Sequence, residues 1–175
     1  MSAREELAAA RLSGPAPAAA GTAEGTGPHP GFFALDVVTP RGSVFRGQVY
    51  SVVVPGSEGY LGFLPGHLPM IALLAPGVLH FRRSREAPVE RMAITGGVVS
   101  VQRDRVTVLA EAAELASHID LARARAARDR ALERIRSRAA DVDLRRAHAA
   151  LRRALARIEA AEHQQADGKD RLRES

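Results

Sequence analysis

The chain has 175 residues, a formal net charge of +5 and no cysteine. This length suits one ordinary domain, or a smaller domain with an appendage. The lack of cysteine excludes disulfides, thiolate metal sites and cysteine nucleophiles, and no apolar run approaches the roughly 20 residues that cross a bilayer. Any membrane association is therefore expected to come through a partner.

Residues 1–31 are rich in Ala, Gly, Pro and Thr and show no sustained period of 2 or 3.6 residues. Such a segment cannot bury enough apolar surface to offset the entropy lost on ordering. We therefore predict a disordered leader over 1–31. The first residues include Glu5 and Glu6 and lack a compact apolar core, so no secretory signal is expected.

From Phe33 onward, short runs of β-branched and aromatic residues are separated by turn residues. Strands are predicted at 33–39, 44–54, 70–74, 78–81, 89–94, 98–102 and 106–110. Turns are predicted at 40–42, 55–56, 76–77, 96–97 and 103–105. Short strands without a helical insertion favour an antiparallel β sandwich or a flattened barrel, which we place at 32–112.

One segment between these runs, 56–69, has the sequence GSEGYLGFLPGHLP. Its glycines and prolines leave little room for a regular element, while its aromatic and leucine side chains hold it in place. We predict an ordered turn with a fixed shape. His67 has Glu58 and His80 as possible partners, but a lone loop histidine more often serves packing or hydrogen bonding than catalysis.

After residue 110 the apolar period becomes 3.6, and helices are predicted at 119–138 and at 143 to about 163. Ser117 or Asp120 can cap the first helix, and Asp141 or Asp143 the second. The apolar stripe of the second helix is Leu144, Ala147, Leu151, Leu155 and Ile158. The first helix has the poorer stripe Leu121, Ala124, Ala127, Ala131, Leu132 and Ile135. We predict an antiparallel helical hairpin within 113–164 and a flexible tail over 165–175.

The seam between the two helices of this hairpin is rich in alanine, and buried alanine contacts contribute less stabilising free energy than leucine contacts would. The hairpin is therefore expected to close weakly and to be able to leave a self-sufficient β domain. A permanently docked appendage is the alternative, and the sequence leaves both interpretations open.

The positive charge is concentrated in this helical region, where residues 119–164 carry twelve Arg against seven acids. A basic helix can bind nucleic acid, an anionic membrane, a nucleotide or an acidic protein groove. Nucleic-acid binding by an Arg-rich hairpin is one alternative function, although the helices offer no aromatic ring for base stacking. No phosphate-binding, metalloprotease or nucleophile-elbow motif is present, so we expect neither catalysis nor a metal site.

Several motifs, taken together and in order, resemble the epsilon subunit family of the F-type ATP synthase. They are LDVVTP at 35–40, GSEGYLGFLPGH at 56–67, the Pro-Gly of 75–79, TGGVVSVQ at 95–102, VTVLAEAAE at 106–114 and DVD with the following helix at 141–158. The resemblance covers about three quarters of the chain. It implies a β sandwich followed by a helical hairpin on the central stalk of the enzyme.

By this resemblance the sandwich would bind the gamma subunit and the membrane ring of c subunits. Ser57, Glu58, Gly59 and Tyr60 would lie nearest the ring, and His67 toward gamma. A charged residue is common in the family where Tyr60 stands. The resemblance also implies a non-catalytic subunit on the cytoplasmic face of the bacterial plasma membrane, associated with the membrane only through its partners.

The resemblance further implies a regulatory ATP site, because some bacterial family members bind ATP between the folded helices and the sandwich. The sequence Ile-Asp-Leu-Ala-Arg-Ala at 119–124 matches their motif. The residues this assigns to ATP are Glu114, Asp120, Arg123, Ala124, Arg153 and Arg157. No cofactor is required. With ATP bound the hairpin would stay folded; without it the helices would extend to the catalytic alpha and beta head and inhibit hydrolysis. The alternative is that Asp120 only caps a helix and pairs with Arg123.

Overall fold

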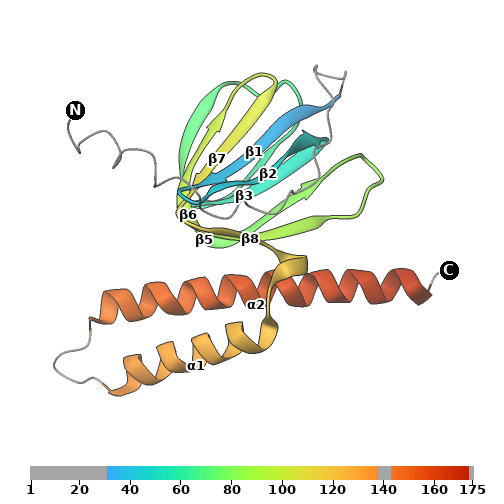
Figure 1. The fold of residues 1–175 in the computed structure, drawn as a ribbon. Helices are drawn as coiled ribbons and strands as arrows, with labels where there is room; N and C mark the ends of the chain where they lie inside the picture. The colour runs from blue at the N-terminus through green and yellow to red at the C-terminus, as the bar shows by residue number, and fades with distance from the viewer. Residues whose placement is uncertain (1–30, 138–142, 174–175) are drawn as a thin grey trace, which may run out of the picture.

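The computed structural model describes residues 31–137 and 143–173 of the chain. In this part, a twisted sheet domain lies on one side of two long helices (Figure 1). The strands are β1 (Phe33–Thr39), β2 (Gly42–Val49), β3 (Ser51–Gly56), β4 (Gly59–Phe63), β5 (Met70–Arg82), β6 (Glu90–Val101), β7 (Arg105–Ala110) and β8 (Ala113–Leu115). A 3₁₀ helix, η1 (Ala116–His118), and the helices α1 (Leu121–Ser137) and α2 (Leu144–Arg173) follow. The leader predicted before Gly31 lies outside the described residues, as does the possible cap Asp141.

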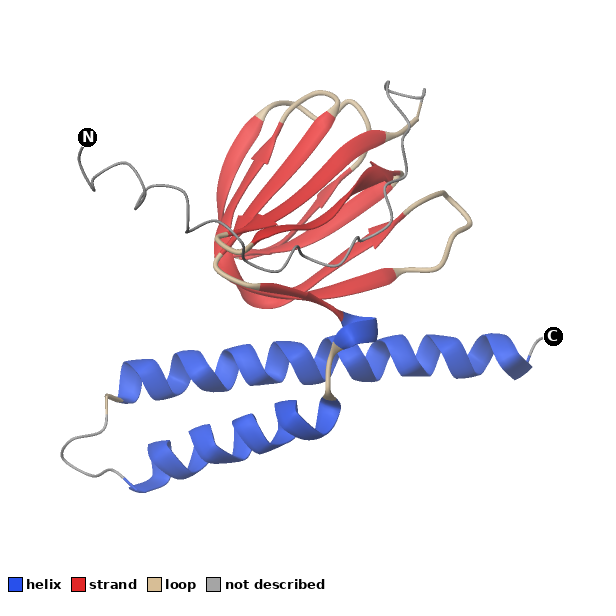
Figure 2. Cartoon of the chain, in the orientation of Figure 1, coloured by secondary structure: helices blue, strands red, loops and turns tan. Residues whose placement is uncertain are grey.

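The strands join in the order β2-β1-β7-β6-β5-β3-β4, and β8 pairs with β6. All pairs are antiparallel except β1 with β7. The sheet curls around one apolar core, to which every strand from β1 to β7 contributes. Across this core the rings of Phe45 on β2 and Phe81 on β5 lie 4.6 Å apart between centroids, although these strands are not neighbours. The predicted β sandwich followed by two helices is confirmed (Figure 2).

Two predicted turns are bends within long strands. β5 passes through Pro76–Gly77 and β6 through Gly96–Gly97, and the two strands stay paired on both sides of the bend. Gly97 has φ +136°, and a Cβ there would lie 2.0 Å from the carbonyl oxygen of Leu109. The glycines therefore allow close strand approach and curvature, and the prediction of chain reversals at these sites was wrong.

The sequence prediction also differs from the structure at two other places in the sandwich. The strand predicted at 44–54 breaks at Tyr50, where the chain turns from β2 into β3. The segment 56–69, predicted to lack a regular element, contains β4 paired with β3. Its first two glycines close a tight β hairpin, in which Gly56 pairs with Gly59. Gly59 has φ +140°. The buried side chain of Phe63 then anchors β4 to the core.

Both helices begin at predicted caps. Oδ1 of Asp120 accepts the backbone N–H of Arg123 at 3.0 Å, and Oδ1 of Asp143 accepts that of Arg146 at 3.1 Å. α2 lies between the sheet and α1, so the hairpin is folded against the sandwich (Figure 2). We predicted that this helix ends near 163, but it continues to Arg173 through the predicted tail. No proline stops it there, and its single glycine costs only about 1 kcal/mol.

The predicted apolar stripe of α2 was wrong at two of its three leucines. Leu144 and Leu155 are each 46% exposed, whereas the buried positions are mostly alanines. Ala156 and Ala160 pack against Val78 and Ala93 on the outer face of the sheet. The other buried alanines recur every seven residues, which is the spacing of a seam between packed helices; they are Ala124 and Ala131 on α1, and Ala147, Ala154 and Ala161 on α2. A helix that contacts partners on two sides uses small side chains so that both can approach closely.

Within the described ranges, no helix combines the length and the apolar character needed to span a bilayer.

Candidate functional site

A cleft of about 630 Å³ opens between the sandwich and the helical hairpin. Four parts of the chain line it: the turn between β1 and β2, the segment from β7 to η1, helix α1 and helix α2. The lining residues are Thr39, Arg41, Glu111, Ala112, Ala113, Glu114, His118, Ile119, Asp120, Arg123, Ala124, Ala127, Arg130 and Arg157. The volume lies in the range typical of small-molecule and cofactor sites.

The structure brings together five of the six residues that the sequence assigned to a nucleotide. Glu114, Asp120, Arg123, Ala124 and Arg157 all line the cleft. Arg153 does not, although it is only partly exposed on α2.

Three of these residues, Glu114, Asp120 and Arg157, already bond to other parts of the protein through their side chains. The Nε of Arg157 donates to Oε2 of Glu114 at 2.9 Å, and this ion pair joins α2 to β8. Asp120 caps α1, as the alternative interpretation held, but its bond goes to the backbone of Arg123 and not to the guanidinium. Capping and lining the cleft are therefore compatible roles for Asp120.

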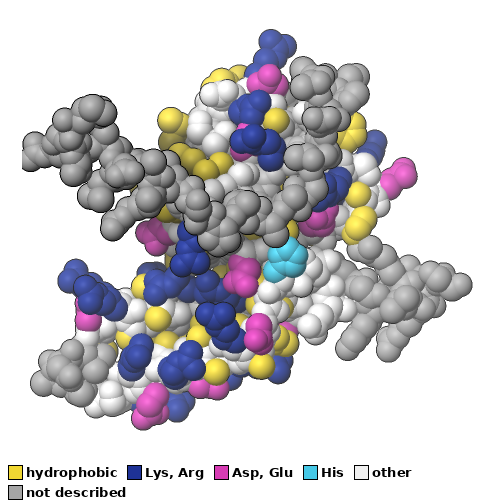
Figure 3. Space-filling view, in the orientation of Figure 1, with side chains coloured by type: hydrophobic (Ala, Val, Ile, Leu, Met, Phe, Trp, Pro, Cys, Tyr) yellow, Lys and Arg dark blue, Asp and Glu magenta, His cyan; other side chains and the backbone are white. Residues whose placement is uncertain are grey.

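The lining is rich in charge of both signs. Four arginines stand against three carboxylates, and among the described residues only Arg157 of the four has an ion-pair partner. Figure 3 shows Lys and Arg side chains gathered on the helices and at their border with the sandwich. Unpaired guanidinium groups facing a cleft can bind phosphate or carboxylate groups through paired N–H donors.

Sequence reasoning missed Arg41 and Arg130 as lining residues. Arg130 follows Arg123 by seven positions and so lies on the same helix face, a spacing that could have indicated it. Arg41 stands in a turn far away in sequence, and only the fold brings it to the cleft. No group of three His, Cys, Asp or Glu side chains in the described part of the chain is arranged to hold a metal ion.

The second site predicted from the sequence is the segment around β4. Ser57 and Glu58 form the exposed tip of the β3–β4 hairpin, and Gly59 and Tyr60 begin β4. His67 lies elsewhere, in the β4–β5 loop, where its Nδ1 is 2.8 Å from the carbonyl oxygen of Leu68. Its ring packs edge-on against Phe63 with centroids 4.9 Å apart. These contacts are the packing and hydrogen-bonding role expected for a lone loop histidine.

Tyr60 contacts the sandwich and also faces α2. Its ring lies 6.1 Å from that of His80 between centroids. Burial raises the pKa of the Tyr60 hydroxyl above its usual value, and the negative charge of Glu159 on α2 raises it further. Tyr60 is thus placed between the tip of the β3–β4 hairpin and helix α2.

An apolar row crosses the outer face of the sheet. The strand register places Val38, Leu109, Val98 and Leu73 side by side on β1, β7, β6 and β5. Leu109 is 53% exposed and Leu73 is 65% exposed, and the nearby Leu64, Leu68 and Ile71 are exposed as well. Contiguous exposed apolar side chains of this kind are typical of interaction surfaces.

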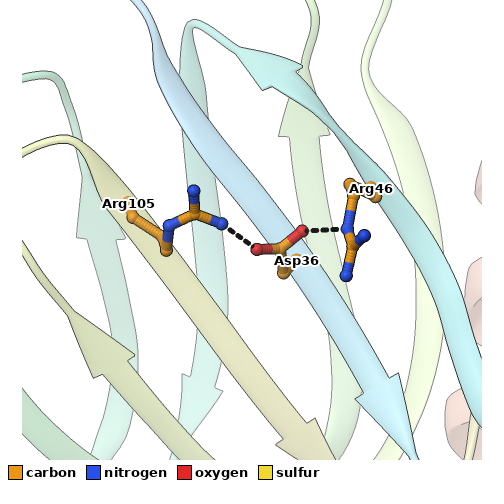
Figure 4. A network of polar contacts seen from close by, with 3 residues as sticks. All are labelled: Asp36, Arg46 and Arg105. Atoms are coloured by element: carbon orange, nitrogen blue, oxygen red, sulfur yellow. Dashed lines mark hydrogen bonds and ion pairs between the residues drawn. The ribbon is translucent and has the colours of Figure 1, made fainter. Parts of the chain in front are cut away.

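An ion network lies in the next row of the same outer face. Asp36 on β1 is buried, and its Oδ1 accepts a hydrogen bond from Nε of Arg46 on β2 at 2.9 Å. Its Oδ2 accepts one from Arg105 on β7 (Figure 4). A carboxylate held by two guanidinium groups from the flanking strands fixes three strands together beside the apolar row.

Comparison with known proteins agrees with this architecture. A family model described as the β-sandwich domain of the ATP synthase delta/epsilon chain matches residues 32–116, and one described as the long α-helix domain of that chain matches residues 117–162. Together they span most of the chain. The chain belongs to the ATP synthase delta/epsilon chain family.

Curated members of the delta/epsilon chain family are similar in sequence. The ATP synthase epsilon chain of Alkalihalophilus pseudofirmus is 48% identical over 103 residues, which are 59% of this chain and 76% of that protein. The epsilon chain of Bacillus subtilis is 46% identical over 105 residues, 60% of this chain and 78% of that protein. These matches give no support to the alternative of an Arg-rich nucleic-acid-binding hairpin.

A solved structure shares the fold. A chain in the Euglena gracilis mitochondrial ATP synthase OSCP/F1/c-ring structure superposes with a TM-score of 0.65 at 22% identity, covering 88% of this chain and 91% of that one. The sandwich and the helical hairpin of this delta/epsilon family member thus have a known structural counterpart.

Proposed function

We propose that this chain is a non-catalytic rotor subunit of an F-type ATP synthase, in which the sandwich couples the central stalk to the membrane c ring and the helices regulate ATP hydrolysis. The observation that carries the proposal is how the hairpin is attached. Ala156 and Ala160 of α2 pack on the outer face of β5 and β6, and none of the described helix residues belongs to the main core. A hairpin attached in this way can leave the sandwich without unfolding it.

The sandwich offers two exposed features to its partners. The tip at Ser57 and Glu58, with Gly59 and Tyr60 behind it, would approach the c ring, because glycines in a hairpin permit close contact. The apolar row and the loop that carries His67 would face the gamma subunit. Association with the cytoplasmic face of the bacterial plasma membrane would occur through these partners alone.

ATP is proposed as a regulatory ligand of the cleft, not as a required cofactor. Its phosphates would be held by Arg123 and Arg130 of α1 and by Arg157 of α2, which converge on the cleft from two helices. Ala124 leaves space in the wall between them. Arg153 stands one helical turn before Arg157 and does not line the cleft. We therefore propose only a secondary role for Arg153 in binding ATP.

Regulation would follow from the different affinity of ATP for the folded and extended hairpin. A ligand held by both helices and the sandwich binds only the folded state, and so it shifts the population toward that state. Without ATP, the Glu114–Arg157 ion pair and the alanine contacts alone would hold the hairpin. The released helices would extend along the stalk, and their arginines would meet acidic surfaces of the catalytic head and slow hydrolysis.

The test uses the ATP synthase head reconstituted with the full chain, with a chain ending at Ala116, or with the double variant Leu73→Asp/Leu109→Asp. We expect the shortened chain to co-purify with the gamma subunit and to raise hydrolysis by about fivefold or more, which corresponds to a typical coupling free energy. The double variant should lose co-purification, because it places two charges on the apolar row. The matched control is Leu144→Asp, which alters an exposed leucine on α2.

Unchanged hydrolysis with the shortened chain would refute the regulatory role of the helices. Retention of the double variant on the gamma subunit would refute the assignment of the apolar row. Circular dichroism of each chain before assembly verifies that the sandwich is folded.

A further inference from the structure

The sheet side of the cleft carries a cation of its own, Arg41. It stands in the two-residue turn between β1 and β2, and it is one of the residues that line the cleft. The hydroxyl of Thr39 accepts the backbone N–H of Arg41 at 3.3 Å and donates to the carbonyl oxygen of Gly42 at 3.2 Å. Gly42 completes the turn with φ +122°. The backbone that carries Arg41 is therefore fixed to the sandwich.

Arg41 is also available for a ligand. Among the described residues its guanidinium has no carboxylate within ion-pair distance, and the same holds for Arg123 and Arg130. Of the three acids in the lining, Glu114 is engaged by Arg157 and Asp120 caps α1, whereas Glu111 forms no ion pair with a described residue. Three unpaired arginines thus face one cleft, of which two move with the hairpin and one stays with the sandwich.

We propose that Arg41 binds phosphate from the sandwich side, so that a nucleoside triphosphate in the cleft bridges the β1–β2 turn, α1 and α2. This inference rests on the proposed nucleotide site and adds how the ligand fastens the hairpin. A phosphate held only by helix arginines would stabilise the hairpin itself. A phosphate that also binds Arg41 stabilises the contact between hairpin and sandwich, which is the contact that regulation must control.

The experiment titrates ATP and adenosine into the full chain and into Arg41→Ala, Arg123→Ala and Arg103→Ala. Arg103 is the matched control, because it is an exposed turn arginine of the same sandwich that does not line the cleft. Loss of one charged hydrogen-bonding group should weaken ATP binding about tenfold for Arg41→Ala. Adenosine, which lacks phosphate, should bind Arg41→Ala as it binds the unaltered chain.

Arg41→Lys provides a second variant. Lysine keeps the positive charge but lacks the paired N–H donors of the guanidinium group. Arg41→Lys should therefore bind ATP more tightly than Arg41→Ala and less tightly than the unaltered chain. All variants are compared by thermal unfolding, to verify that the turn remains folded.

Equal ATP affinity of Arg41→Ala and the unaltered chain, with weaker binding by Arg123→Ala, would overturn the role of Arg41 and leave the nucleotide site standing. If Arg41→Ala lost affinity equally for ATP and for adenosine, the proposed contact between Arg41 and phosphate would be overturned. No binding of ATP by the unaltered chain would overturn both this inference and the proposed site.

Discussion

The contact between α2 and the sandwich can be broken by one substitution, Ala160→Arg. Ala160 is 0% exposed and lies against Val78 and Ala93 on the sheet. An arginine there has no room for its side chain and no solvent for its charge. We expect the hairpin to leave the sandwich, and we expect the sandwich to stay folded because its main core, as far as the structure describes the chain, contains no helix residue.

The size of this effect follows from the contact itself. Release exposes four buried alanine methyl groups, of Ala93, Ala116, Ala156 and Ala160, together with Val78. At about 0.8 kcal/mol per methyl-sized group the alanines contribute about 3 kcal/mol, and Val78 adds about 2 kcal/mol at most. The Glu114–Arg157 pair, whose side chains are about one third exposed, adds about 1 kcal/mol or less. Burial of an unpaired arginine costs several kcal/mol, and overpacking adds about 1–3 kcal/mol, so the substitution outweighs the contact.

The assay is fluorescence energy transfer between dyes on Arg85→Cys in the β5–β6 loop and Gln165→Cys on α2, both exposed positions. The natural chain has no cysteine, so the two dyes attach only at these sites. Energy transfer should fall in Ala160→Arg and stay high in Ala166→Arg, which places the same side chain at an exposed position of the same helix.

Two results would refute this reasoning. Unchanged energy transfer in Ala160→Arg would mean that the alanine contact does not hold α2 to the sheet. A large fall in the unfolding temperature of the sandwich itself would mean that the sandwich depends on the helices.

Two further predictions concern the sandwich and the pH dependence of docking. Gly97→Ala should destabilise the sandwich by about 3 kcal/mol or more in chemical denaturation, because it combines a strained φ with a clash against the Leu109 carbonyl. Gly42→Ala, with a similar φ but open space, should cost no more than about 1–3 kcal/mol. Burial lowers the pKa of His80, and the positive charges of Arg91 and of His163 on α2 lower it further. Protonation therefore favours the released hairpin. Docking should be complete at pH above about 6.5 and weaken as the pH falls through the lowered pKa, as measured by energy transfer. His80→Gln should remove most of this dependence, and an unchanged pH profile would contradict the assignment.

Most strands could be predicted because their apolar residues alternate with period 2. β1 and β7 match their predicted ranges within a residue. The errors arose where a glycine or proline was taken as a chain reversal, at Gly96–Gly97 and in the segment around β4. Glycine permits a reversal, a bend or a close strand approach equally well. Which of these occurs depends on the strand that lies opposite, and a single sequence does not contain that information.

In the candidate site, too, some residues could be recognised from the sequence and others only from the fold. The acid and arginines of the helical region could be recognised from their motif, and Asp120 could be recognised as a cap from its position. Arg41 could not, because it comes from a turn roughly eighty residues earlier in the chain. The exclusion of Arg153 from the cleft likewise depends on how α2 is rotated against the sheet, which the helical period alone does not set.

The sequence by itself determined that strands are followed by two helices, the candidate caps of those helices and the concentration of arginine in the hairpin, because these depend on neighbours a few positions away. The tertiary structure decided which side of α2 meets the sheet. The buried positions of this helix are mostly alanines, although hydrophobicity alone favoured leucines. This is because α2 has partners on two sides, and close approach to both requires small side chains. That packing also sets the border between hairpin and sandwich, where the cleft and its arginines lie.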